Sequence, residues 1–214
     1  MFGQKNYYKE SLKILAEQGY SDEYVEELKK GIAASKGTKA AEGICNLTNA
    51  YIFRGELSEA VKAFENVEMK RLKPYIAGIL AGNMMLCLFI LNKFKEVDEL
   101  FEKYNDMILR DNSVVMKRSL AIHEHIRKRY ENSVTILIKI IDEADPRDTM
   151  FVDICLIKSF LRLDMYERAF EFSKGLDRYN NKNELTDEVT KLRKKIFDNL
   201  SAENKVKMIK KRVK

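Results

Sequence analysis

The sequence predicts an all-α protein built from repeated helical hairpins, and three observations support this class. Residues that are expected to end helices recur at a nearly constant interval. The intervals are 36, 37, 36 and 36 residues between Gly19, Gly55, Asn92, Lys128 and Asp164. A period of this length indicates a stacked-repeat architecture. The 214 residues include nine Gly and two Pro, which are few for the many turns of a β-rich protein. Lys, Glu, Leu and Ala, all good helix formers, are common.

The second repeat unit illustrates how each hairpin is encoded. Leu47 and Tyr51 share one face of an expected first helix, because residues four apart lie on the same side of a helix. Gly55 is expected to end that helix, since Gly adopts the left-handed conformation without a Cβ clash. Ser58 is expected to cap a second helix, in which the small Ala60 allows the two helices to approach closely. The other units repeat this arrangement.

This unit resembles the tetratricopeptide repeat, or TPR, whose signature spans about 34 residues. The matching residues of the second unit are Ile44, Leu47, Thr48, Tyr51, Ala60, Phe64 and Pro74. The present repeat is 36 or 37 residues long, and the chain has no Trp. The resemblance implies a right-handed α-solenoid of TPR-like helical hairpins. We expect five hairpins over residues 1–182, followed by C-terminal capping helices with a basic tail over residues 183–214. After residue 183 the spacing predicts two more helices. Thr186 is the expected cap of the first, and Val206 and Ile209 would lie on the second.

One stretch is apolar enough to require a comparison with membrane helices. Residues 75–91 carry no charge over 17 positions, whereas a spanning helix usually needs about 20 apolar residues. The stretch also falls where the repeat predicts a first helix, so we expect a buried core helix. Cys45, Cys87 and Cys155 are odd in number and far apart, which favours reduced, buried thiols in a cytoplasmic protein.

Positive charge is concentrated at the C-terminal end. The chain has a net charge of +6, and residues 191–214 hold ten Lys/Arg and two acidic residues. Such a segment can attract acidic proteins, nucleic acid or an anionic lipid surface. Alternatively, it is the solvated surface of a capping helix, which repeat arrays need for solubility.

Sequence motifs for catalysis or metal binding are lacking. His123 and His125 are the only histidines, and at a spacing of two they point roughly 200° apart on a helix, so they cannot share one ion. The sequence has no Cys-x-x-Cys pair, no phosphate-binding Gly-rich loop and no Gly-x-Ser-x-Gly. We therefore expect no enzyme, no cofactor and no metal site.

The TPR resemblance implies that ligands bind on the concave face, which the first helices of the hairpins line. Helical spacing from the expected core places these partner-binding candidates there: Asn49, Phe53, Ile79, Leu86, Phe89, Ile90, Arg118, Ile122, Ile126, Lys158 and Arg162. The centre of this set is apolar, and its far end carries three cations. We therefore expect a non-catalytic scaffold or adaptor that binds a protein or peptide. The expected partner is an amphipathic helix or extended peptide with an apolar stripe and an acidic flank.

The sequence also allows two arrangements in which this apolar face is not exposed to solvent. Tight superhelical curvature would bury the apolar residues within the chain, and a homodimer would cover them with a second copy. The alternative function is a protein that binds nucleic acid or an anionic membrane surface through its basic tail.

Overall fold

The structure is a computed structural model that describes residues 7–109, 112–178, 183–202 and 205. Within these ranges the secondary structure is helical and includes no strand. The α-helices of the described residues are α1 (Tyr7–Gln18), α2 (Asp22–Ala33), α3 (Thr38–Arg54), α4 (Leu57–Glu65), α5 (Pro74–Ile90), α6 (Phe94–Leu109), α7 (Val114–Ile126), α8 (Tyr130–Ile140), α9 (Pro146–Arg162), α10 (Tyr166–Ser173) and α11 (Glu184–Asn199). Short 3₁₀ segments cover Met69–Arg71 and Lys174–Arg178.

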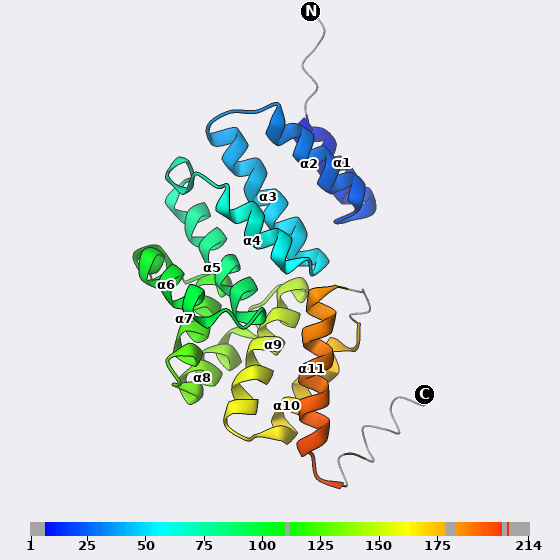
Figure 1. The fold of residues 1–214 in the computed structure, drawn as a ribbon, viewed down its shortest axis with the longest axis vertical. Helices are drawn as coiled ribbons and strands as arrows, with labels where there is room; N and C mark the ends of the chain where they lie inside the picture. Colours follow the sequence, from blue (N-terminus) through cyan, green and yellow to red (C-terminus); the bar gives the residue numbers. More distant parts are fainter. Residues whose placement is uncertain (1–6, 110–111, 179–182, 203–204, 206–214) are drawn as a thin grey trace, which may run out of the picture.

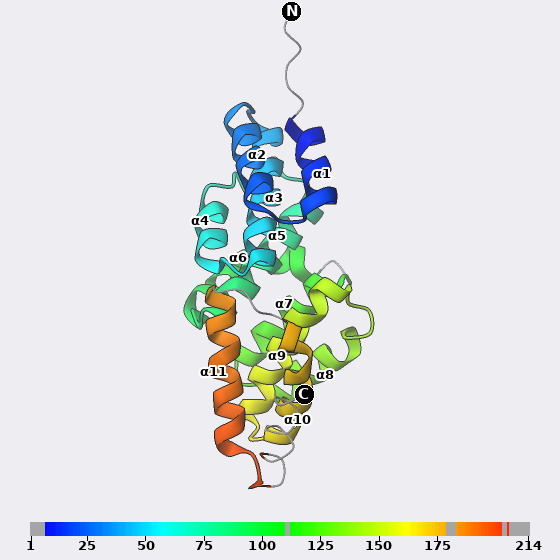
Figure 2. The same ribbon diagram turned by 90° about the vertical axis from the view of Figure 1, so that its right-hand side faces the viewer.

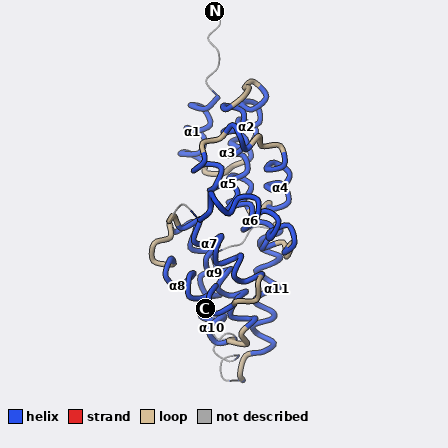
Figure 3. Tube along the Cα trace, turned by 90° about the vertical axis from the view of Figure 1, so that its left-hand side faces the viewer, coloured by secondary structure: helices blue, strands red, loops and turns tan. Residues whose placement is uncertain are grey.

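Consecutive helices form pairs, and the pairs stack along the long axis of the molecule (Figures 1 and 3). We call α1–α2, α3–α4, α5–α6, α7–α8 and α9–α10 hairpins one to five. Helix α11 follows hairpin five and packs against α9 and α10. The all-α prediction is thus confirmed for the described part of the chain, as a bundle of stacked neighbouring helices. Among the described helices, none combines the length and hydropathy that crossing a membrane requires.

All five predicted turn residues have left-handed backbone conformations. The φ angle is 65° at Gly19, 73° at Gly55, 61° at Asn92, 63° at Lys128 and 55° at Asp164. The residue after each of the last four turns donates its backbone N–H to the carbonyl five residues earlier, in the pairs Glu56–Tyr51, Lys93–Leu88, Arg129–Glu124 and Met165–Phe160. This recurring bond is the Schellman C-cap, which satisfies carbonyls that the end of a helix leaves without partners.

The residue five positions after each turn is buried in every hairpin. Tyr24, Ala60, Val97, Ser133 and Ala169 are all at most 4% exposed. Because these positions share one place in the second helix, each hairpin uses that place for its contact with the core. The burial of this column agrees with the spacing of the repeat in the sequence.

Two predicted helix caps are wrong. Helix α4 begins at Leu57 after Glu56, so Ser58 lies inside its first turn. Helix α11 begins after Asn183, whose side chain accepts a 3.0 Å hydrogen bond from the backbone N–H of Thr186. A Ser or Thr hydroxyl can serve a tertiary contact as well as a cap, and Ser58 Oγ donates to Glu184 of α11. The predicted final helix around Val206 and Ile209 lies outside the described residues.

Helix α9 contacts the first helices of three other hairpins. The ring of Phe151 lies 5.9 Å from that of Phe53 on α3. Lys158 Nζ lies 5.2 Å from the ring centroid of Phe89 on α5. Ser159 Oγ is 2.8 Å from Nδ1 of His125 on α7. The array therefore curves tightly enough for hairpin five to touch hairpin two, and residues 151–161 of α9 are all buried.

Candidate functional site

The apolar centre of the predicted partner-binding face is buried inside the protein. Leu86, Phe89, Ile90 and Ile122 are at most 1% exposed. Ile126 is partly buried. The ring of Phe89 is surrounded by three groups, the rings of Phe94 at 5.9 Å and His125 at 4.9 Å and the ammonium group of Lys158. The prediction of an open apolar groove at the fully buried residues is therefore wrong, because α9 packs over this face.

The three predicted residues nearest the N-terminal end are partly buried. Asn49 accepts a 3.1 Å hydrogen bond from the side chain of Asn83. The ring of Phe53 stacks on Tyr20 with 4.9 Å between centroids. Ile79 packs against the main core. These side chains therefore join neighbouring elements of the fold.

Arg118 is a buried structural group. Its side chain is 0% exposed. It donates to Asn83 Oδ1 at 2.8 Å and to Asp148 Oδ1 at 3.4 Å. The guanidinium also lies 5.9 Å from the ring centroid of Phe151. Arg118 therefore links α5, α7 and α9, and the prediction that it offers a surface charge is wrong.

Lys158 is buried at the junction of three elements. Its Nζ lies 2.5 Å from Glu188 Oε1 on α11, 3.1 Å from Asn92 Oδ1 and 3.4 Å from the carbonyl oxygen of Ile90. Burial lowers the pKa of the Lys158 ammonium, and the nearby carboxylate of Glu188 opposes this shift. The ion pair thus ties α11 and α9 to the turn between α5 and α6.

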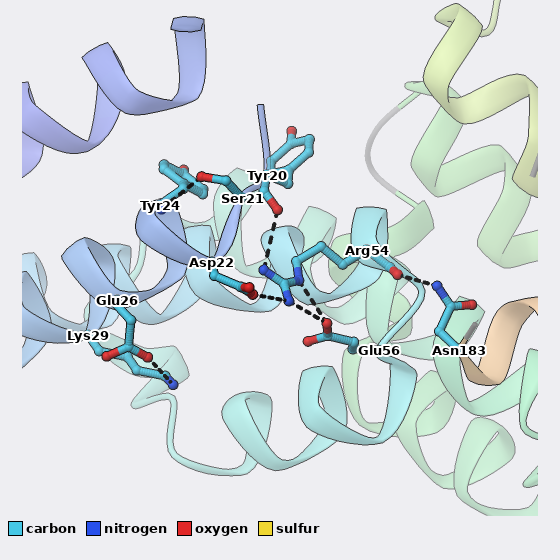
Figure 4. A network of polar contacts seen from close by, with 9 residues as sticks. All are labelled: Tyr20, Ser21, Asp22, Tyr24, Glu26, Lys29, Arg54, Glu56 and Asn183. Atoms are coloured by element: carbon cyan, nitrogen blue, oxygen red, sulfur yellow. Dashed lines mark hydrogen bonds and ion pairs between the residues drawn. The ribbon is translucent and has the colours of Figure 1, made fainter. Parts of the chain in front are cut away.

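The N-terminal end of α11 is anchored on hairpin two. Asn183 Nδ2 donates to the carbonyl oxygen of Arg54 at 2.5 Å, and the Leu185 N–H donates to the carbonyl of Gly55 at 3.4 Å. Glu184 accepts from the backbone N–H of Ser58 at 2.6 Å, in the first turn of α4, where a helix favours negative charge. Figure 4 shows Asn183 reaching the end of α3. In Figure 2, α11 lies below α4 on the same side of the molecule.

The Arg54 side chain forms a second polar cluster beside this anchor. Its guanidinium lies 2.6 Å from both Asp22 and Glu56, and it donates to the carbonyl of Tyr20 at 3.4 Å (Figure 4). Arg54 thus joins the turns of hairpins one and two while its own carbonyl holds Asn183. The anchor of α11 therefore rests on a point where two hairpins are already linked.

A cavity of about 250 Å³ lies where α9 and α11 meet, next to the turn between α5 and α6. Its charged lining consists of Lys158 and Arg162 from α9 and Glu188, Lys191 and Lys195 from α11. We call it the cationic pocket. Asn92 and Phe94 form another part of its wall.

The cations of this pocket fall into two groups. Lys158 is paired with Glu188, as described above. Arg162, Lys191 and Lys195 are exposed, and within the described part of the chain no carboxylate forms an ion pair with them. The pocket therefore carries an excess of positive charge on three surface side chains.

His125 lines the same pocket from α7. Burial, together with the nearby charges of Arg162 and Lys158, lowers the pKa of its imidazole to about 3. The neutral ring is only 4% exposed and bonds to Ser159. It therefore contributes packing, and its depressed pKa reflects its burial first and the positive charge of the neighbouring cations second.

A separate polar cluster combines Asp98 and Glu102 of α6 with His123 of α7, and their carboxylate oxygens and ring nitrogen lie within 4.8 Å of one another. The guanidinium of Arg127 is 3.0 Å from Asp98 and 3.3 Å from Glu102, so it already compensates both carboxylates. The ring of His123 stacks on Phe101 at 3.7 Å. This group was not predicted from the sequence, because its members lie on two helices and only the spacing of the two histidines was considered.

The three cysteines are free, buried thiols, as predicted. Burial raises the pKa of Cys45, Cys87 and Cys155 to about 12 each. A thiol with such a pKa is almost entirely protonated at neutral pH, so these side chains are poor nucleophiles.

The structure brings together charges that the sequence analysis treated separately. Arg162 was expected on the concave face, whereas Lys191 and Lys195 were part of the basic tail. The signal that could have joined them is the spacing of Lys191 and Lys195, which are four residues apart on one helix face next to the apolar Leu192. Comparison of the chain with protein-family models, with curated proteins and with solved structures gave no significant match.

Proposed function

We propose that this chain is a non-catalytic scaffold or adaptor of the TPR-like, right-handed solenoid type that binds an acidic segment of a partner protein. One observation carries the proposal: Arg162, Lys191 and Lys195, from two different helices, line one cavity and lack a carboxylate partner among the described residues. The 36-residue repeat and the left-handed turns support the solenoid part of the proposal.

The burial of the apolar strip changes the kind of binding that we propose. Phe89 and Ile122 cannot contribute contact area, so charge supplies much of the interaction. Exposed ion pairs are worth roughly 1 kcal/mol each at most, and three of them raise affinity by about 100-fold. Such contacts mainly steer association and select the partner, and they weaken as salt rises. We therefore propose that the pocket is the anchor for an acidic group within a wider contact.

Nucleic acid is the second candidate partner. It is favoured by the ten Lys/Arg among residues 191–214, most of which lie beyond α11. Both candidates predict binding that is sensitive to salt, so salt alone does not separate them. The two differ in the residues that they need. An acidic protein segment needs the pocket, whereas a nucleic acid contact along the tail needs residues 206–214.

The test measures fluorescence anisotropy of a labelled oligoglutamate peptide and of a labelled single-stranded oligonucleotide during titration with the full-length chain. Lys195→Glu is expected to weaken peptide binding by about tenfold, because it reverses one charge in the pocket. The matched control is Lys194→Glu, since Lys194 is exposed on the same helix but does not line the pocket. Equal weakening by both variants, or loss only after deletion of residues 206–214, would contradict the proposal.

A further inference from the structure

The charge of the cationic pocket exceeds what one carboxylate can balance. Lys158, Arg162, Lys191 and Lys195 line it, and Glu188 is the acidic residue of the lining. Glu188 is already occupied by Lys158. The remaining three cations face a cavity that is slightly smaller than the roughly 300–1,000 Å³ of sites for drug-sized ligands. The pocket therefore suits a compact group with more than one negative charge.

Carboxylates elsewhere in this protein show the contrast. Glu124 is held by the single guanidinium of Arg129, with both of its oxygens bonded at 2.6 Å. Glu143 is held by the single ammonium of Lys117 at 2.7 Å. In these pairs one cation is enough for one carboxylate. A single Glu or Asp from a partner would leave two of the three pocket cations uncompensated.

We infer that the cationic pocket recognises a phosphoryl group, carried by the partner segment, through Arg162, Lys191 and Lys195. A phosphoryl group carries a charge of about −1.5 to −2 at neutral pH and has three acceptor oxygens. The planar guanidinium of Arg162 can donate two parallel hydrogen bonds to such a group, and each lysine adds a point charge. The inference rests on the proposed function, since it names the chemistry that the same pocket accepts.

Phosphoryl binding is also coupled to the docking of α11. Lys191 and Lys195 belong to α11, so the pocket is complete only while this helix lies against α9. A ligand that binds only the docked form increases the ratio of docked to undocked molecules by the factor 1 + [L]/Kd, which is about elevenfold when the free ligand is at ten times its Kd. The bond from the Leu185 N–H to the Gly55 carbonyl reports docking, because it connects α11 to hairpin two.

The experiment compares three peptides of identical acidic flanks that differ at one position, which is Ser, Glu or phosphoserine. Isothermal titration calorimetry with the full-length chain is expected to show the phosphoserine peptide binding at least about tenfold more tightly than the Glu peptide. Lys195→Glu should remove this difference and Lys194→Glu should keep it. Hydrogen exchange at the Leu185 N–H is expected to slow when the phosphoserine peptide binds, and unchanged exchange would overturn the coupling.

The outcomes separate this inference from the proposed function. Equal affinity for the Glu and phosphoserine peptides would overturn the inference and leave the proposed function standing, whereas no binding of any peptide would overturn both. Inorganic pyrophosphate is expected to displace the phosphoserine peptide, and failure to displace it would place the peptide elsewhere and overturn the inference. Tighter binding of pyrophosphate than of the peptide would support the phosphoryl site and assign it to a free phosphate compound.

Discussion

The ion pair between Lys158 and Glu188 gives the sharpest test of how α11 is held. Lys158→Met keeps most of the side-chain volume but removes the ammonium group that lies 2.5 Å from Glu188 Oε1. Glu188 is only 9% exposed, so its carboxylate would stay buried without a cation. Loss of one partner of a buried pair typically costs about 3–5 kcal/mol.

We therefore expect Lys158→Met to lower the free energy of unfolding by about 3–5 kcal/mol. The double variant Lys158→Met/Glu188→Leu should lie within about 1 kcal/mol of the parent, because it leaves no buried charge.

Urea denaturation of the parent and of both variants, followed by circular dichroism, measures these differences. A loss below about 1 kcal/mol for Lys158→Met would show that water solvates Glu188 well enough to replace the lysine. This result would refute the view that the buried pair fixes α11 to α9.

Three further changes test the fold by equilibrium denaturation. Ala60→Glu should cost about 3 kcal/mol or more, because Ala60 is 0% exposed at the contact within hairpin two, and a loss under about 1 kcal/mol would place this residue at the surface. Lys128→Gly should stabilise the chain by up to about 1 kcal/mol, since Lys128 is exposed with a φ of 63°, and destabilisation would count against backbone strain there. Burial raises the pKa of Asp153 from 3.8 to about 6, so its stabilising contribution is present below about pH 4 and declines as the pH rises to about 6. Asp153→Asn should therefore be more stable than the parent at pH 7 and similar to it at pH 4, and an equal difference at both pH values would contradict this assignment.

Local features of the fold could be predicted from the sequence. A helix ends where a residue tolerates the left-handed conformation and the chain must turn, and both requirements are visible at Gly55 and Asn92. The buried column that includes Ala60 and Val97 follows from the same spacing. These features depend on neighbours within one hairpin, so the repeat interval was sufficient to locate them.

The site could not be predicted in the same way, because it depends on how tightly the hairpins curve. The spacing that placed Phe89 on a first helix does not reveal that Lys158 of hairpin five covers its ring. Arg118 likewise looked like a surface cation until the packing of α9 brought Asp148 to it. Small rotations between successive hairpins add up over three repeats. The resulting curvature of the array cannot be predicted from the sequence pattern within one hairpin.

The most direct test of anion recognition in the cationic pocket is an anomalous scattering map from crystals soaked in tungstate, a tetrahedral oxyanion that imitates phosphate. We predict a tungstate peak within hydrogen-bonding distance of Arg162, Lys191 and Lys195, which disappears in the Lys195→Glu variant and persists in Lys194→Glu. A map with no peak in this pocket, or with a peak that Lys195→Glu leaves unchanged, would contradict anion recognition by the cationic pocket.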